Sequence, residues 1–279
     1  MRLIDMHTHV GRLLRDIPAN RPEDLIATLD RYGLERAAVM ACDNPEELDY
    51  YVTTEMVLAA CARYPDRLIP FCNVDPRHRY PDRFDPRPLI EDYIAQGCRG
   101  FGEILAGVPI DYPGLQQIYG VCGELGLPVL FHADHHICYD ELGLPRLERM
   151  LQTYPDTIFI GHATHFWAEI TADVTLDDYR GGHYPTGPVT PIGAADRLLT
   201  TYPNLFADLS ARSGYNAVTR DPAFGLSFLE RHQDKLLFAT DTLRPAQDQP
   251  IVDFIRTCGI SEAARARIGY QNAVRLLRL

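Results

Sequence analysis

The chain has 279 residues, of which 46% are hydrophobic, and its 27 basic and 38 acidic residues give a net charge of −11. This length suits one large domain or two small ones, and the apolar content is ample for a large buried core. The negative charge disfavours nonspecific binding to nucleic acid or anionic membrane. No apolar run approaches the roughly 20 residues of a membrane-spanning helix.

Seven cysteines are scattered along the chain without a Cys-x-x-Cys pair, and their number is odd. This pattern is typical of reduced, mostly buried thiols in a cytosolic protein. Cys42 and Cys72 each end an apolar run and are expected to pack in the core. The chain runs from Met1 directly into Leu3 without a basic and then apolar leader, so we expect no secretory signal. Both observations favour a cytoplasmic location.

Short apolar runs recur along the chain, most of them about 30 residues after the previous one, which is the length of a strand–helix unit. They are continuous rather than alternating, as in strands buried on both faces. The expected strands are Leu3–Met6, Ala37–Cys42, Leu68–Val74, Cys98–Glu103, Val129–His132, Thr157–His162, Leu205–Leu209 and Leu236–Thr240.

The segments between these runs show helical spacing of apolar residues, and several stop at a glycine before the next strand. The expected helices are Arg21–Tyr32, Pro45–Tyr64, Pro86–Gln96, Tyr112–Leu125 and Leu144–Tyr154. Eight strands alternating with helices predict an α/β fold, a (β/α)8 TIM barrel, which typically needs about 250 residues. We therefore expect residues 1–279 to form a single domain.

The connection between the sixth and seventh strands is longer than the others. Its first part, about residues 164–191, contains Gly181, Gly182, Gly187 and several prolines, and is too broken for one helix. A long structured loop in a compact domain is often functional, and a surface excursion without catalytic duty is the alternative.

Polar residues fall where the expected strands end. In a barrel of this kind, the carboxyl ends of all strands meet on the face that holds active sites. A buried group of imidazoles and carboxylates needs compensation, and a divalent cation supplies it directly. The strand-end residues are His7, His9, Glu103, His132, His162, Asp208, Ser210 and Asp241.

His7 and His9 form a His-x-His pair on the first strand. Side chains at positions i and i+2 of an extended strand point to the same side, so the two imidazoles can hold one ion together. Imidazole with carboxylate is a ligand set suited to zinc, manganese, iron or nickel.

Motifs spread over nearly the whole chain resemble the amidohydrolase superfamily. More narrowly, they resemble the amidohydrolase-related (amidohydrolase 2) branch, which contains metal-dependent hydrolases, lactonases and decarboxylases. The motifs are Asp5-Met6-His7-Thr8-His9, Phe131-His132-Ala133, Ile160-Gly161-His162-Ala163, Phe238-Ala239-Thr240-Asp241 and the closing stretch Ile268–Leu277.

The resemblance implies roles for these residues. His7, His9 and His132 would be metal ligands, and Asp241 would be both a ligand and the general base. His162 would bind a second metal or hydrogen-bond the reacting water. Zinc is the expected metal, as one or two ions.

One feature departs from the commonest two-metal version of this family, which bridges its ions with a carboxylated lysine after the fourth strand. The stretch Arg99-Gly100-Phe101-Gly102-Glu103 offers no lysine. Glu103 would then bridge two ions as a metal ligand, or lie outside a one-metal site with a structural or substrate-facing role.

Residues near the expected strand ends are candidates for substrate binding. Arg212 follows the seventh strand and Arg244 lies just beyond Asp241, and either could pair with a substrate carboxylate. His165 opens the long loop and could cover substrate. His78 and His232 lie in polar stretches and are expected to be exposed.

The leading functional hypothesis is a metal-dependent hydrolase that uses a metal-activated water to cleave an amide, lactone or ester bond of a small molecule. A metal-dependent decarboxylase or hydratase of a small carboxylic acid would use the same ligands. A two-metal phosphodiesterase and a non-catalytic barrel that only binds metal or ligand are further alternatives. No nucleotide-binding motif is present, and a homo-oligomer is compatible with the sequence.

Overall fold

The structure is a computed structural model that describes residues 1–46, 48–180 and 184–279. In this described part, eight strands pair in chain order from β1 to β8, each parallel to the next. The strands are β1 (Ile4–Thr8), β2 (Arg36–Val39), β3 (Leu68–Cys72), β4 (Gly100–Ile104), β5 (Val129–His132), β6 (Phe159–His162), β7 (Leu205–Asp208) and β8 (Leu236–Leu237).

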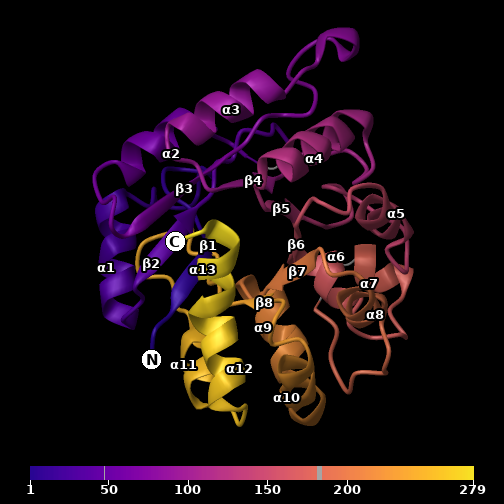
Figure 1. Cartoon of the computed structure of the whole chain (residues 1–279). Coiled ribbons are helices and arrows are strands. Elements are labelled where there is room, and N and C mark those ends of the chain that lie inside the picture. The colour runs from indigo at the N-terminus through magenta and orange to yellow at the C-terminus, as the bar shows by residue number, and fades with distance from the viewer. Residues whose placement is uncertain (47, 181–183) are drawn as a thin grey trace.

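The segment that follows β8 returns to β1 and nearly closes the sheet into a barrel. The backbone N–H of His9 donates to the carbonyl of Thr242 at 2.8 Å, and the N–H of Asp241 donates to the carbonyl of His7 at 2.8 Å. Figure 1 shows the helices as an outer layer around the strands. The expected (β/α)8 TIM barrel is confirmed.

The two faces of the sheet are both buried. Ala38 of β2 and Met40, the residue after β2, belong to an apolar cluster inside the barrel, whereas Ala37 and Val39 belong to a cluster between the strands and the helices. Successive residues of a strand point to opposite faces, so burial on both sides requires continuous apolar runs.

Helices follow most of the strands, and none in the described residues is both long and apolar enough to span a bilayer. The helices are α1 (Pro22–Tyr32), α2 (Thr54–Cys61), the 3-10 turn η1 (Pro81–Arg83), α3 (Arg87–Ala95), α4 (Pro113–Leu125), α5 (Pro145–Thr153), α6 (Ala163–Ala168), α7 (Leu176–Arg180), α8 (Ala194–Thr201), α9 (Ala211–Thr219), α10 (Pro222–Arg231), α11 (Pro250–Thr257), α12 (Glu262–Ala266), the π-helical turn η2 (Arg267–Gln271) and α13 (Asn272–Leu277).

Four of the five expected helices are confirmed to within one residue at each end, as α1, α3, α4 and α5. The fifth, Pro45–Tyr64, is wrong in its first half, because the helix spans only Thr54–Cys61. Cys42 and Val52 exchange two backbone hydrogen bonds of 2.8 Å, so the chain after β2 folds back on itself instead of coiling. Residue 47 of this stretch lies outside the described residues.

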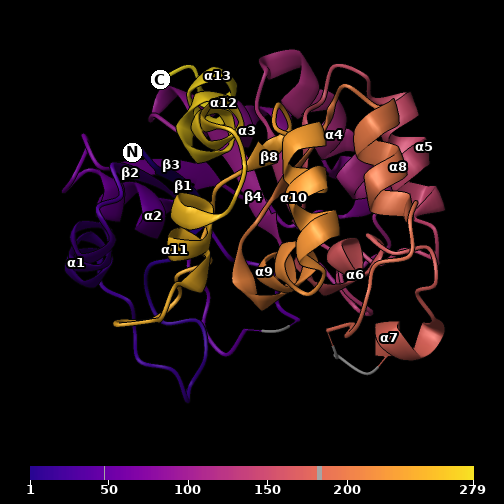
Figure 2. The same ribbon diagram turned by 90° about the horizontal axis from the view of Figure 1, so that it is seen from below.

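The connection between β6 and β7 contains α6, α7 and α8. The N–H of Ala172 donates to the carbonyl of Thr190 at 2.7 Å, and the N–H of Val189 donates to the Asp221 side chain at 3.1 Å. These bonds hold the two ends of the long loop together and tie it to the start of α10. Figure 2 shows α7 projecting on the side away from the two termini. Residues 181–183, which fall within this excursion, lie outside the described residues.

The expectation that His232 is exposed is wrong. Its side chain is buried, and its Nε2 lies 2.6 Å from Oδ1 of Asp196. The other oxygen of Asp196 pairs with Arg231 at 2.7 Å. The polar residues around His232 in the sequence therefore accompany a buried carboxylate of α8 that contacts the end of α10.

Candidate metal centre

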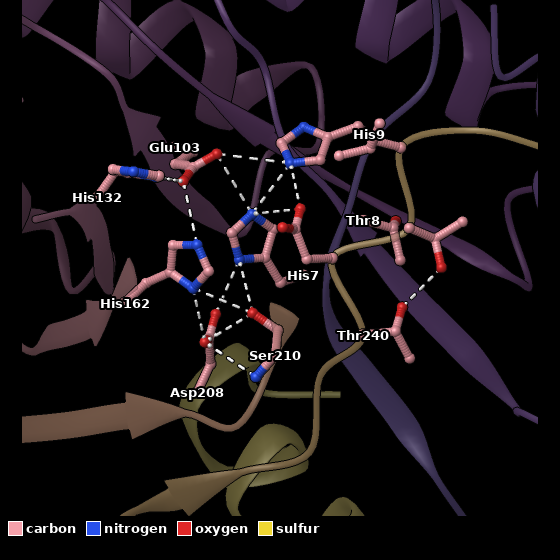
Figure 3. Close-up of polar contacts among 12 residues, drawn as sticks. His7, Thr8, His9, Glu103, His132, His162, Asp208, Ser210 and Thr240 are labelled. Carbon is pink, nitrogen blue, oxygen red and sulfur yellow. Dashed lines mark hydrogen bonds and ion pairs between the residues drawn. The ribbon is translucent and has the colours of Figure 1, made fainter. Parts of the chain in front are cut away.

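The strand-end residues come together at the carboxyl end of the barrel (Figure 3). His7 lies in β1 and His9 directly follows it, while Glu103 lies in β4. His132 and His162 are the last residues of β5 and β6. Within the strand-end group, His132 and Asp241 are partly open to solvent, with 22% and 19% of their side chains exposed.

Four donor atoms form a compact group at the centre of this site. They are Nε2 of His7, Nε2 of His9, Oε2 of Glu103 and Oδ1 of Asp241. Five separations among them range from 3.1 to 3.8 Å. Tetrahedral ligands held about 2.1 Å from an ion lie about 3.4 Å from one another, so these five separations suit ligands of a divalent cation. Ligand atoms of His7, His9 and Asp241 all lie within 4.8 Å of one another, as do those of His7, Glu103 and His162.

Glu103 faces two sides of the site with its two oxygens. Oε2 belongs to the four-atom group, whereas Oε1 lies 2.8 Å from Nδ1 of His132 and 3.5 Å from Nε2 of His162 (Figure 3). His132 thus stands outside the four-atom group, and its role as a ligand stays a prediction. The two-sided position of Glu103 suits both sequence-based alternatives, a bridge between two ions and a group beside a single ion.

Asp208, at the end of β7, holds the outer edges of two imidazoles. Its Oδ2 lies 2.8 Å from Nδ1 of His7, and its Oδ1 lies 2.9 Å from Nδ1 of His162. Ser210 donates a hydrogen bond of 2.8 Å to the same Oδ1. Trp167 donates from Nε1 to the carbonyl of Asp208 at 3.0 Å. The sequence placed Asp208 at the right face of the barrel but gave no sign of these partners.

Cys42 and Asp5 complete the surroundings of the histidine pair. Sγ of Cys42 lies 3.3 Å from Nδ1 of His9. Asp5 accepts hydrogen bonds from the backbone N–H and the hydroxyl of Thr240, at 3.0 and 2.6 Å, which joins β1 to the segment after β8. Burial raises the pKa of the Asp5 carboxyl to about 7.

The charges of the buried groups are strongly coupled. Burial opposes ionisation of Glu103, yet the neighbouring His7 and His132 hold its pKa well below the ordinary value. Burial likewise acts against the positive form of His7, but Glu103 and Asp208 raise the pKa of that imidazole well above its usual range. The carboxylates thus create a strong demand for positive charge, which protons or a metal cation can meet.

The two candidate substrate arginines lie together beside this centre. Arg212 and Arg244 line a cavity of about 470 Å3 whose wall includes Thr240, the residue before Asp241. Among the described residues, neither arginine forms an ion pair. Tyr184, from the long β6–β7 loop, has its pKa raised by burial, with Arg212 lowering it and Asp241 raising it. Tyr184 therefore lies within electrostatic range of both Arg212 and Asp241.

His165 is buried in α6, and its ring centre lies 5.9 Å from that of His135. Its backbone N–H donates to the carbonyl of Ala133, the residue after His132, at 3.0 Å. This bond places His165 next to the strand-end group. Substrate binding by His165 stays a prediction.

Comparison of the sequence with known families explains this constellation. The profile of the amidohydrolase family (Amidohydro_2) matches residues 4–279, almost the whole chain. The chain belongs to the amidohydrolase family. The resemblance seen in the strand-end motifs is therefore confirmed. No similar sequence was found among curated proteins.

Solved structures share the fold of this amidohydrolase at low sequence identity. An uncharacterised TIM-barrel protein from Bordetella bronchiseptica is 15% identical, with 100% of this chain and 99% of that chain covered and a TM-score of 0.68. A probable 2-pyrone-4,6-dicarboxylic acid hydrolase from Acinetobacter baumannii is 17% identical, with both chains fully covered and a TM-score of 0.64. A dihydroxybenzoic acid decarboxylase from Polaromonas with bound manganese is 16% identical, with 99% and 97% covered and a TM-score of 0.61.

Proposed function

We propose that this amidohydrolase is a metal-dependent hydrolase that cleaves an amide, lactone or ester bond of a small molecule. The observation that supports this proposal is the group of four donor atoms from His7, His9, Glu103 and Asp241, five of whose separations are 3.1–3.8 Å and suit ligands of a divalent cation. A cation held there would polarise the scissile carbonyl and lower the pKa of an attacking water to about 7.

Asp241 is the residue that would move the proton. Its side chain is 19% exposed, so it can contact a substrate as well as the imidazoles of His7 and His9. Asp241 would accept a proton from the attacking water and pass it to the leaving group, as a general base and then a general acid.

His162 would orient the attacking water. Its Nδ1 is engaged by Asp208 and Ser210, at 2.9 and 3.0 Å, so Nε2 is the ring atom left to face the reaction centre. When Nδ1 carries the proton and donates to Asp208, Nε2 accepts a hydrogen bond. That tautomer lets Nε2 accept from the water while Asp241 takes its other proton.

Arg212 and Arg244 would select a substrate that carries a carboxylate. They line the cavity beside Asp241 and lack a carboxylate partner among the described residues. A guanidinium binds a carboxylate through two parallel hydrogen bonds, which fixes the direction of the substrate. His165 is a further residue proposed to contact the substrate.

The test is an assay of purified protein against small lactones, esters and amides that carry a carboxylate, with released acid titrated for the lactones and esters and released amine measured for the amides. We expect turnover that a chelator abolishes and added zinc restores. Full activity in metal-free protein would contradict the proposal. Metal analysis of the purified protein should show zinc, and manganese in its place would correct the identity of the ion but not the mechanism.

Decarboxylation is the second candidate, because the same arginine pair would suit a carboxylic acid substrate and a fold relative from Polaromonas is named as a decarboxylase. The two reactions have different products. Carbon dioxide released from an aromatic or unsaturated acid, with no net release of acid from esters or lactones, would favour decarboxylation over hydrolysis.

We also propose that the enzyme works in the cytoplasm. All seven cysteines are free thiols, and six of them are buried. A reducing compartment preserves such thiols. Fractionation of cells that express the tagged chain, with marker enzymes for each compartment, would test this location.

A further inference from the structure

The backbone of His9 is fixed at the candidate metal centre, so the direction of its ring depends on the side-chain torsions. Its backbone N–H donates to Thr242 at 2.8 Å, and its carbonyl accepts from Nδ2 of Asn20 at 2.7 Å. The backbone is therefore held on both sides. A partner on the outer edge of the ring would be needed to fix the direction of Nε2.

That partner is Cys42, whose Sγ lies 3.3 Å from Nδ1 of His9. Both residues are buried, with exposed fractions of 0% for Cys42 and 3% for His9. The backbone of Cys42 is itself fixed, because its N–H and carbonyl both bond to Val52 at 2.8 Å. The loop that replaces the expected helix after β2 thus places a sulfur atom against the imidazole.

We propose that Cys42 is a positioning residue for the metal ligand His9, an inference that rests on the metal-dependent function proposed above. When Nε2 of His9 points its lone pair at a cation, Nδ1 carries the proton and donates to the sulfur. Coordination through Nε2 would fix this tautomer, and the contact with the sulfur holds the ring at the angle at which Nε2 meets His7, Glu103 and Asp241.

The two imidazoles of the His-x-His pair therefore have unequal support. Nδ1 of His7 bonds to the carboxylate of Asp208 at 2.8 Å, whereas Nδ1 of His9 meets a thiol, which is a weak acceptor. A carboxylate partner raises the basicity of a metal-ligating imidazole more than a neutral sulfur does. His9 is thus the weaker donor of the pair. Cys42 would support cation binding by orienting the ring of His9, and not by adding negative charge.

The test measures zinc affinity by competition with a chromophoric chelator, starting from chelator-treated protein. Cys42→Ala removes the acceptor, and we expect about 10-fold weaker zinc binding, the lower end of the effect of losing such a partner. Cys42→Ser keeps an acceptor and should stay within about threefold of the wild type. Cys122→Ala is the matched control, since Cys122 is equally buried in α4, and its zinc affinity should not change.

Two further readouts separate the possible failures. Wild-type protein that binds no divalent metal would refute the proposed function itself. Normal zinc binding by Cys42→Ala would refute only the role of Cys42. If Cys42→Ala binds zinc more weakly, equal unfolding midpoints of the metal-free Cys42→Ala and Cys122→Ala proteins would exclude a general packing defect as the cause. With cobalt in place of zinc, a sulfur-to-cobalt charge-transfer band in the wild type that disappears in Cys42→Ala would overturn the proposal, because Cys42 would then bind the metal directly.

Discussion

Nδ1 of His7 lies 2.8 Å from Oδ2 of Asp208, although 201 positions separate the two residues in the chain. The contact joins β1 to β7 across the end of the barrel. It orients Nε2 of His7 toward the other three atoms of the four-atom group. Asp208 also holds His162 with its second oxygen, at 2.9 Å. One fully buried carboxylate thus sets the direction of two imidazoles.

Asp208→Asn should weaken zinc binding, because an amide presents only one acceptor oxygen and cannot serve both rings. We expect a loss of affinity of about 10- to 100-fold, the range seen when such outer partners are removed. Ser210→Ala serves as a milder comparison, since it removes a donor to Asp208 and leaves both oxygens in place. Equal affinities for Asp208→Asn and the wild type would show that the imidazoles do not need this carboxylate.

Asp241→Asn should lower kcat/KM by about 100- to 10,000-fold, which is the usual contribution of a general acid–base group. The side chain is partly exposed and isosteric with asparagine, so the thermal unfolding midpoint of the variant should stay close to that of the wild type. Asp253→Asn, on the exposed face of α11, should leave both values unchanged. An active Asp241→Asn enzyme would exclude Asp241 as the proton carrier.

The sequence predicted the barrel and the donor group because both depend on local patterns. Apolar runs define the strands, and His7, His9, Glu103 and Asp241 stand at or next to strand ends, where the fold alone brings them together. The tilt and closure of the barrel make the four donor atoms converge, so no pairwise information was needed.

The outer partners could not be predicted, because each depends on a specific long-range contact. Cys42 was expected to be a core thiol, and it is fully buried, but its contact with His9 arises from the loop that folds back through Val52. The helical spacing of apolar residues in 45–64 predicted a helix in place of that loop. Likewise, a polar stretch gave no sign that His232 meets a buried carboxylate from α8.

Arg212→Gln should raise KM for a carboxylated substrate by about 10- to 100-fold with little change in kcat. The loss corresponds to a hydrogen-bonded charge pair worth about 1.5–3 kcal/mol, made equally in the ground and transition states. The control is an analogue of the same substrate with a methyl group in place of the carboxylate, for which the wild type and the variant should have similar KM values. A change in kcat alone would place Arg212 in the chemical step instead.

Gly102→Ala should destabilise the barrel next to Glu103. Gly102 has a φ of +134°, and an added Cβ would lie 2.6 Å from the carbonyl oxygen of Leu130 in β5. Gly97 has a φ of +110° with open space around it, so Gly97→Ala reports the backbone strain alone, about 1–2 kcal/mol. Urea unfolding of the metal-free proteins should show a further loss of about 1–3 kcal/mol for Gly102→Ala, from the close approach. Equal losses for the two variants would mean that β4 can shift away from β5.

Asp196 should stabilise the fold in a manner that depends on pH. Burial acts to raise the pKa of its carboxyl, but His232 and Arg231 more than offset this and hold the pKa below the ordinary value. A carboxyl of this kind contributes stability above its unfolded pKa of about 3.9, and that stability is lost as the pH falls through the lower folded value.

Asp196→Ala should therefore cost about 3 kcal/mol near neutral pH, because it leaves His232 buried without its partner. Urea unfolding of both proteins between pH 7 and pH 3 should show this difference shrinking below about pH 4, because the Asp196 carboxyl of the unfolded wild-type chain then becomes protonated. Asp92→Ala, at an exposed position of α3, should show a small difference at every pH. A cost for Asp196→Ala that stays constant down to pH 3 would mean that packing around the side chain, rather than its charge, stabilises the contact between α8 and α10.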